Sequence, residues 1–410
     1  MRGKVATMLE KIEAEYGISS PLYCRGAFQG SSEIRATSFK GVLRFWWRAL
    51  AWSWFGGDLQ RIQVEEAALF GSASGQGASR GSKQSAVWIR MRAEGEAPWP
   101  GDENGRAGRQ EGVAYLGYGL IGKKAKAEGI FGGRLVVTIS ILGFSRGSRE
   151  FEGILDALEL IGLVGGLGAK TRRGFGSLAL QAIRSAGTGE VLRSGPKDAK
   201  ELEGRLKWFF SRCDGPSHLP EYTALSPRAK FVVLRIADRK DPIELLDALG
   251  KELRRYARDA ERSYAVGEPD GRRVGMDELK SARSLEAPVG AVLGLPRKAN
   301  LRGQSWRDRT EEVTVSPREH DRRGSPVFIH IHAFRSDAPA AVVAFLPGKF
   351  LPGMNKSEFK LIGRIKGGKR IELVVPQAIR EEPFRILEEF IRRLRHCPVE
   401  PLVTVGSYGC

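Results

Sequence analysis

The sequence is poor in cysteine, and its cysteines have no regular spacing. They are Cys24, Cys213, Cys397 and Cys410, and no two of them form a CxxC pair. This distribution excludes a zinc ribbon and a dense disulfide framework. We therefore expect a cytoplasmic protein that holds no metal ion and needs no cofactor.

Long apolar runs are also absent from the sequence. Residues 1–20 lack the apolar run of roughly 7–15 residues that a signal peptide needs. No uninterrupted apolar stretch approaches the ~18 residues that a membrane span requires. We therefore expect a chain that is neither exported nor embedded in a membrane.

Acidic residues are scarce relative to basic ones. The chain has 66 Lys and Arg against 48 Asp and Glu, which gives a net charge of +18 and a pI near 9.9. Such an excess repels itself unless an anion shares the surface, and nucleic acid is the obvious anion. The alternative is a basic protein without a polyanionic partner. The 410 residues, 41% of them hydrophobic, suffice for two domains.

Gly, Ser and Pro concentrate in three segments that are predicted to be loops, at 71–85, 94–112 and 185–204. The first two are candidate contact segments that become ordered on assembly. The third contains a predicted linker at 186–204, between a first module at 1–185 and a second module at 205–410.

The order of predicted elements is similar in the two modules. The first has strands at 20–27, 86–92 and 134–142, helices at 38–55, 64–70 and 150–163, and a strand-like SLAL segment after 176. The second has strands at 230–237, 327–334, 340–345 and 402–405, and helices at 242–258 and 382–395. The β-α-β-β-α-β order predicts an α+β fold of two tandem ferredoxin-like (RRM-like) modules with antiparallel sheets.

The stretch SFKGVLRFWWRALAWSWF at 38–55 is predicted to be an amphipathic helix, capped by Thr37 or Ser38. Lys40, Arg44 and Arg48 occupy one arc and are either solvated or one side of an RNA path. The neighbouring arc is predicted to be core and contains Phe39, Leu43, Trp46, Trp47, Leu50 and Trp54.

Two aromatic residues of this helix do not fit the apolar arc. Phe45 and Trp52 project on the far side of the basic row, so they either meet a second layer or are exposed. An exposed ring beside guanidinium groups can stack the bases of single-stranded RNA. A protein partner covering the two rings is the alternative.

A glycine-rich loop, GGLGAKTRRGFG, occupies 165–176. It matches neither GxxxxGK[ST] nor GxGxxG, and a helix rather than a strand precedes it, which excludes a nucleotide-binding P-loop. Its glycines would let a phosphate approach the backbone, with charge supplied by its cations. The candidate RNA-binding residues are Gly166, Gly168, Lys170, Arg172, Arg173 and Gly174. The alternative is a helix C-terminal turn followed by a hairpin.

The sequence resembles the RAMP superfamily of CRISPR proteins, whose mark is a ferredoxin-like fold with a loop of the form G-h-G-x5-G-h-G, where h is apolar. Residues 166–168 and 174–176 match that spacing. SFKGVLRFWWRAL, EEAALFGS and QSAVWIRM are similar to the first-numbered RAMP subunit family of the Cmr, or type III-B, effector complex. GLP at 294–296 and RRGSPVFIHI at 322–331 resemble reduced motifs of a second module, which has no second glycine loop of this form.

The resemblance implies a non-catalytic subunit of a guide-RNA-loaded antiviral complex. Its expected partners are single-stranded guide and target RNA, near the 3′ end of the guide, and the other Cmr subunits. It assigns RNA contact to Lys40, Arg44 and Arg48 and to the glycine loop, while Trp46 is expected to support the helix from the core.

Two alternatives stay open. Some RAMP relatives cut RNA without metal, with histidine as general acid or base, and His330 and His332 project from the same face of a predicted strand, with His320 upstream. Packing in the strand is the other interpretation of this pair. The glutamate pairs at 65–66, 311–312 and 381–382 are interpreted as solvated helix positions, so no two-metal nuclease is predicted. The third possibility is a purely scaffolding subunit.

Overall fold

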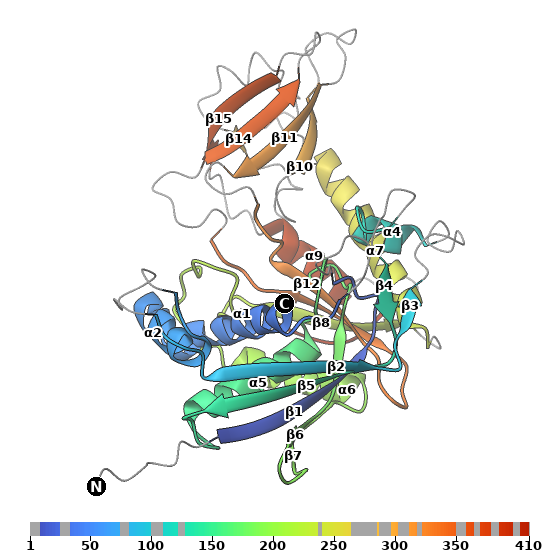
Figure 1. Ribbon diagram of the computed structural model, residues 1–410. Coiled ribbons are helices and arrows are strands. Elements are labelled where there is room, and N and C mark those ends of the chain that lie inside the picture. Colours follow the sequence, from blue (N-terminus) through green and yellow to red (C-terminus); the bar gives the residue numbers. More distant parts are fainter. Residues whose placement is uncertain are drawn as a thin grey trace.

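Two antiparallel sheets with their helices make up the body of the molecule (Figure 1). Within the described residues, no helix is long and apolar enough to span a membrane. The computed structural model describes residues 9–24, 33–73, 82–99, 110–121, 128–236, 240–263, 285–286, 297–301, 311–317, 322–349, 358–364, 370–378, 385–396 and 402–409.

The first sheet has the strand order β2-β5-β1-β6-β7, and all of its pairs are antiparallel. Counted along the chain, its first four strands lie in the order 2-3-1-4, which is the ferredoxin-like arrangement. The predicted strand at 134–142 is confirmed, and the strand predicted at 86–92 is shifted slightly. The strands are β1 (Leu9–Ile18), β2 (Val87–Glu94), β5 (Arg134–Leu142), β6 (Leu178–Ser185) and β7 (Val191–Ser194).

The strand predicted at 20–27 is wrong over its described part, 20–24, because the first strand of the sheet lies earlier, at Leu9–Ile18. Residues 25–27 lie outside the described residues. Its side chains alternate, with Ile12, Ala14, Tyr16 and Ile18 buried. Residues 21–24 instead form an irregular segment that carries a single bridge, from Leu22 to Ile130. This segment is important for the glycine loop described below.

The helices of the first module are α1 (Ala36–Trp54), α2 (Leu59–Phe70) and α5 (Arg149–Leu163). On α1, the predicted apolar arc is buried apart from Trp54, which is half-buried. The predicted cap at Thr37 or Ser38 is wrong: the cap position is Arg35, whose side chain makes no capping hydrogen bond. Side-chain caps do begin the other two helices, from Asp58 on α2 and Ser148 on α5.

The second module confirms the predicted β-α-β-β-α-β order. Its strand order, β12-β13-β8-β16, again reads 2-3-1-4 along the chain, so this module is ferredoxin-like as well. Its elements are β8 (Lys230–Ile236), α7 (Pro242–Ser263), β12 (Val327–His332), β13 (Ala340–Phe345), α9 (Arg385–His396) and β16 (Leu402–Tyr408).

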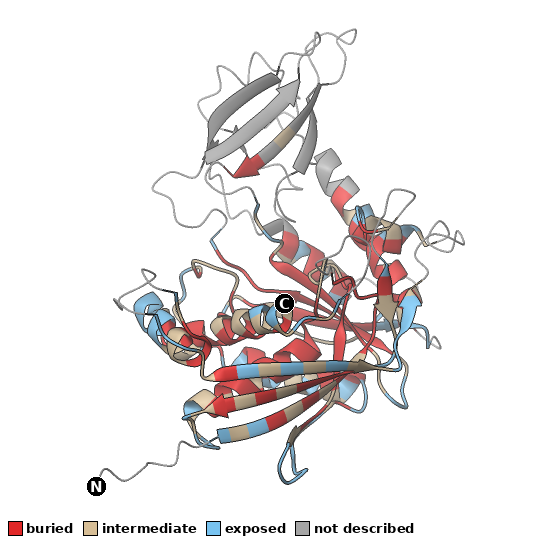
Figure 2. Ribbon diagram, viewed as in Figure 1, coloured by how far each residue is buried: buried red, intermediate tan, exposed pale blue. Residues whose placement is uncertain are grey.

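The sheet of the second module is covered on both faces, and every residue of β12 and β13 is buried (Figure 2). One face packs on α7 and α9, through residues such as Ile329 and Val343. The other face, with Phe328 and Val342, shares one core with the helices of the first module. The two modules are therefore joined by a continuous apolar layer.

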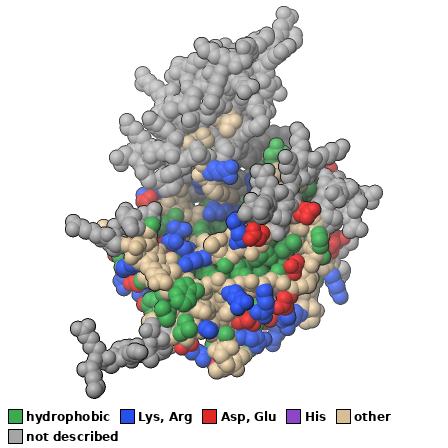
Figure 3. All heavy atoms as spheres, in the orientation of Figure 1, with side chains coloured by type: hydrophobic (Ala, Val, Ile, Leu, Met, Phe, Trp, Pro, Cys, Tyr) green, Lys and Arg blue, Asp and Glu red, His purple; other side chains and the backbone are tan. Residues whose placement is uncertain are grey.

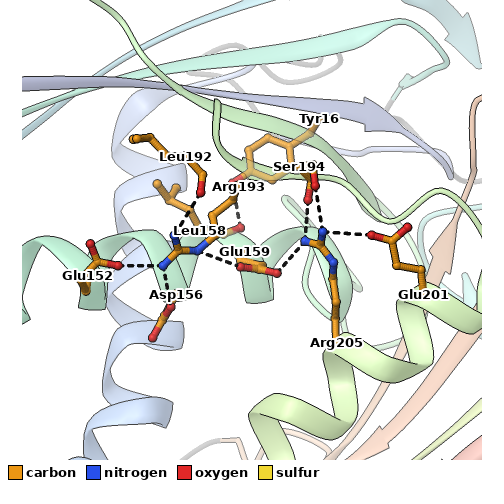
Figure 4. Close-up of polar contacts among 10 residues, drawn as sticks. All are labelled: Tyr16, Glu152, Asp156, Leu158, Glu159, Leu192, Arg193, Ser194, Glu201 and Arg205. Carbon is orange, nitrogen blue, oxygen red and sulfur yellow. Dashed lines mark hydrogen bonds and ion pairs between the residues drawn. The ribbon is translucent and has the colours of Figure 1, made fainter. Parts of the chain in front are cut away.

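The predicted loop at 185–204 contains regular structure instead. It includes β7, which pairs with β6, and the start of α6 (Ala199–Ser211). Glu159 on α5 is buried and accepts contacts from Arg193 on β7 at 3.5 Å and Arg205 on α6 at 2.9 Å (Figure 4). Breaking such a buried pair leaves an uncompensated charge, so this ion network holds β7 and α6 against α5.

Several elements were not predicted. The loop predicted at 94–112 contains β3 and the start of α4, a short helix packed on α7. A third, five-stranded sheet has the order β10-β11-β14-β15-β9 and lies apart from the two packed sheets in Figure 1. The remaining elements are β3 (Ala97–Trp99), α4 (Glu111–Leu116), β4 (Gly129–Phe131), β9 (Leu285–Glu286), β10 (Arg297–Leu301), β11 (Glu311–Pro317), β14 (Glu358–Arg364) and β15 (Arg370–Ala378).

Candidate nucleic-acid interface

The glycine loop at 165–176 runs along the junction between the two modules. It follows α5 of the first module and makes contacts with β12 of the second. The Ile329 amide donates a hydrogen bond to the Arg172 carbonyl at 3.2 Å. The Gly165 carbonyl lies 2.7 Å from Nδ1 of His330. The loop therefore pairs with the edge of the second sheet.

The same loop also folds onto the irregular segment at 21–24. The Gly176 amide donates to the Pro21 carbonyl at 2.9 Å, and the Ala169 amide donates to the Tyr23 carbonyl at 2.8 Å. Backbone groups of the loop are thus satisfied by protein on two sides. This pairing fixes where the tip of the loop lies.

The glycines of the loop are needed because protein backbone and side chains approach them closely. A Cβ on Gly166 would lie 2.5 Å from the Gly176 carbonyl oxygen. Gly168 has φ +92°, and a Cβ there would lie 2.5 Å from the Tyr23 carbonyl oxygen. Gly174 has φ +83° and is packed against the second module. Close packing within the protein therefore accounts for these three glycines, and phosphate contact at them stays a prediction.

Arg172 is directed inward and joins the modules. Its guanidinium carbon lies 5.3 Å from the ring centre of Phe45 on α1 and 4.7 Å from that of Phe328 on β12. It also donates a hydrogen bond to the Ser325 carbonyl. Burial lowers the pKa of Arg172 to about 10. Two aromatic rings and a carbonyl thus surround much of the Arg172 guanidinium group, and RNA contact by this side chain stays a prediction.

Lys170 occupies the exposed tip of the loop, with φ +61°. Burial of part of its side chain, then Arg173, then Arg322 lower the pKa of its ammonium group. Arg323 has a pKa lowered to about 10, by burial and then by Arg172. We call Lys170, Arg172, Arg173, Arg322 and Arg323 the joint cluster. Cations of both modules thus meet at one place.

Sequence reasoning missed Arg322 and Arg323 as members of the site. A signal was present, because the pair stands only a few residues before the apolar strand β12. The sequence does not show, however, that this strand pairs with the glycine loop, and that pairing is what brings the two arginines to the site. The second module therefore contributes cations to this surface although it has no glycine loop of its own.

The basic row of α1 adjoins the joint cluster, because Arg172 lies over Phe45 on the same helix. This row is partly neutralised. The buried Glu66 of α2 contacts Arg44 at 2.8 Å and Arg48 at 3.7 Å. Lys40 donates a 2.6 Å hydrogen bond to Ser85, and burial followed by the nearby Arg44 lowers the pKa of Lys40.

The two predicted halves of the RNA path meet where Arg172 of the glycine loop lies over Phe45 of α1. Figure 3 shows Lys and Arg side chains at several places on the visible face, with Asp and Glu side chains among them. On α1 the basic row is paired with an acid, Glu66, and at the glycine loop Arg322 of the second module lowers the pKa of Lys170. The joint cluster and the row on α1 together form the candidate anion-binding surface.

Comparisons with known proteins agree with this architecture. Residues 18–179 match the sequence model of the RAMP superfamily. The CRISPR system Cmr subunit Cmr1-2 of Pyrococcus furiosus is 30% identical over 190 residues, which cover 40% of this chain and 92% of that protein. The chain belongs to the RAMP superfamily. Cmr subunit Cmr1-1 of the same organism is 30% identical over 154 residues, covering 36% of this chain and 40% of the relative.

The fold of this RAMP protein is also that of a solved Cmr structure. The crystal structure of Cmr1 from Pyrococcus furiosus, in its apo form, superimposes with a TM-score of 0.53 at 18% identity. The match covers 97% of this chain and 98% of that one. This likeness extends the relationship in fold to both modules.

The two aromatic residues proposed for base stacking differ in their surroundings in this RAMP protein. Trp52 is only 1% exposed and packs edge-on against His218 and Tyr222, so the prediction that it stacks RNA bases is wrong. Phe45 is half-buried and packs against Phe328 at 5.9 Å. Both rings nevertheless contact residues of the second module, because this module packs across α1.

The histidine pair of β12 is enclosed in the shared core. His330 and His332 are fully buried, with Nε2 of the first 3.3 Å from Nδ1 of the second. Burial lowers the pKa of His330 to about 4, and burial followed by His330 lowers that of His332 well below its usual value. Neither ring can reach a substrate in solvent. His320 and the GLP segment at 294–296 lie outside the described residues.

The described part of the chain also contains no group of three or more His, Cys, Asp or Glu side chains arranged to hold a metal ion. The glutamates at 65–66 separate: Glu66 is buried and pairs with the cations of α1, and Glu65 is half-buried. The lysine and arginine side chains of the joint cluster and of α1 carry charge and hydrogen-bond donors, which are the chemistry of anion binding.

Proposed function

We propose that this protein is a non-catalytic RNA-binding subunit of a CRISPR Cmr-type effector complex in the cytoplasm. Its relatives from Pyrococcus furiosus are named as Cmr subunits, which supports assembly with other Cmr subunits. In such a complex the protein would contact single-stranded guide or target RNA, near the 3′ end of the guide.

The observation that carries the proposal is the pairing of the glycine loop with the start of β12, where Arg172 donates a hydrogen bond to the Ser325 carbonyl and a bridge joins Arg173 to Ile329. This pairing brings the loop cation Lys170 near Arg322 of the second module, which lowers the pKa of Lys170. Like charges held close together raise the free energy of the folded protein, and an anion placed between them lowers it. A phosphodiester backbone supplies such anions at regular intervals. Arg44 and Arg48, each more than a third exposed, extend the basic surface along α1.

The test is a titration of labelled single-stranded RNA with the full-length protein at three salt concentrations. Lys170→Ala/Arg322→Ala removes two cations of the joint cluster. Arg146→Ala/Arg184→Ala is the matched control, because these residues lie near the far end of β6, where Arg146 pairs with Glu190. The double variant of the cluster should reduce the slope of log affinity against log salt by about 1.4, or about 0.7 per phosphate.

The control should keep the wild-type slope. If both double variants weaken RNA binding equally, binding depends only on the net charge of the protein. That result would contradict a specific RNA site at the joint cluster. Intact RNA on a denaturing gel after incubation supports a non-catalytic role. Shortened RNA would favour a histidine nuclease, while intact RNA with no binding would favour a scaffold.

A further inference from the structure

Tyr118 is the most exposed large apolar or aromatic side chain in the part of the chain that the structure describes. It is 79% exposed, whereas Trp88 and Trp208 are 47% and 46% exposed. Most of the ring is accessible to water, although burial of a tyrosine ring lowers the free energy of the protein. An aromatic residue kept in this position is suited to contact a partner.

The backbone that carries Tyr118 is well ordered by hydrogen bonds. The Gly117 amide donates to the Val113 carbonyl at 2.8 Å, and the Leu120 amide donates to the Gly117 carbonyl at 2.8 Å. Leu120 itself is buried in the core beneath. The turn therefore presents the ring outward from a fixed base.

This turn rests on the glycine loop. A Cβ on Gly117 would lie 2.8 Å from the ring of Phe175, so only glycine lets the turn approach so closely. The Phe175 amide in turn donates to the Lys170 carbonyl at 3.4 Å. One buried ring thus links the turn of Tyr118 to the tip of the loop that carries Lys170.

The helix before the turn is anchored to the second module. Oδ1 of Asp247 on α7 accepts hydrogen bonds from the amides of Gly112 at 2.8 Å and Val113 at 3.1 Å. Gly112 also packs directly against Gly250 of α7. The position of Tyr118 is therefore set by the same junction that assembles the joint cluster.

We propose that Tyr118 is a stacking platform for a base of the single-stranded RNA whose phosphates bind the joint cluster. This inference rests on the proposed function. A tyrosine ring loses only two torsional freedoms on binding and accepts any base on its π face.

The experiment measures binding and stacking together in the full-length protein. A single-stranded RNA carrying one 2-aminopurine is titrated with wild type, Tyr118→Ala and Tyr118→Phe, because stacking quenches the fluorescence of 2-aminopurine. Trp208→Ala is the control, since Trp208 is another exposed ring, covered in part by Arg212 at 4.5 Å. Both positions are exposed, so each variant should keep the wild-type melting temperature.

Tyr118→Ala should weaken binding about fivefold or more and abolish the quenching at the base it stacks, while Tyr118→Phe stays near wild type. The loss should be equal at every salt concentration, because no phosphate contact is removed. The salt dependence thus distinguishes Tyr118→Ala from Lys170→Ala/Arg322→Ala, which changes the slope of log affinity against log salt.

Wild-type affinity in Tyr118→Ala, together with weak binding in Lys170→Ala/Arg322→Ala, would overturn the platform and leave the proposed function standing. Equal weakening in Tyr118→Phe and Tyr118→Ala would assign the contact to the hydroxyl and also overturn stacking. Loss of partner-subunit binding with unchanged RNA affinity would make the ring a protein contact. No RNA binding by wild type would overturn both proposals.

Discussion

The guanidinium carbon of Arg172 lies 4.7 Å from the ring centre of Phe328, so a loop of the first module makes a cation–π contact with a strand of the second. Arg172→Ala should lower the free energy of unfolding by about 2 kcal/mol, because cation–π contacts and a hydrogen bond to Ser325 are lost together. Urea unfolding measures this. Arg146→Ala, which removes an exposed ion pair, should cost under about 1 kcal/mol. Equal stability of the two variants would contradict the role of Arg172 in holding the two modules together.

The buried histidine pair predicts a stability that falls in acid. The pKa of His330 is lowered from 6.5 to about 4 in the folded protein. Between these values the unfolded chain binds the proton and the folded chain does not, so unfolding becomes easier as pH falls from about 6.5 to 4. The loss attributable to His330 is about 3 kcal/mol.

The measurement compares urea unfolding of wild type and His330→Gln from pH 7.5 to 4. The comparison is necessary because burial raises the pKa of Asp156 to about 6 and also raises that of Glu159, which stabilises the fold as pH falls. Those carboxyl groups are present in both proteins and cancel in the difference. A difference that does not vary with pH would show that His330 titrates normally.

Replacing Gly168 with alanine should destabilise the protein more than the same change at Gly189, a glycine of similar backbone conformation. Gly168 has φ +92° and Gly189 has φ +72°, but only Gly168 has a carbonyl oxygen, that of Tyr23, 2.5 Å from an added Cβ. We expect Gly189→Ala to cost about 1 kcal/mol from backbone strain alone, and Gly168→Ala about 3 kcal/mol. Thermal unfolding of both variants checks this, and similar losses would contradict the close approach.

Glu66→Gln should strengthen RNA binding if the basic row of α1 forms part of the path. Glu66 contacts both Arg44 and Arg48, so neutralising it leaves both guanidinium groups available to phosphate. We expect two- to fivefold tighter binding at low salt, of the order of 1 kcal/mol or less. Glu190→Gln, which releases Arg146 at a distance, is the charge-matched control. Equal gains in both variants would limit the effect to net charge.

Local sequence patterns determined most of the elements around the site. The apolar period of α1, the branched residues of β5 and the element order of the second module were all predicted from residues close together in the chain. The signal for β1 is equally local, because the buried residues alternate along the strand: Ile12, Ala14, Tyr16 and Ile18. Such patterns are readable because helix and strand periods depend on neighbouring residues alone.

The tertiary structure alone decided which of the predicted site residues face solvent. The sequence identified Lys170 and Arg172 as equivalent loop cations, yet one lies at the exposed tip and the other between Phe45 and Phe328. In the same way Trp52 is buried by the second module. Burial and ion pairing depend on which distant segments meet, and no local period in the sequence encodes that contact.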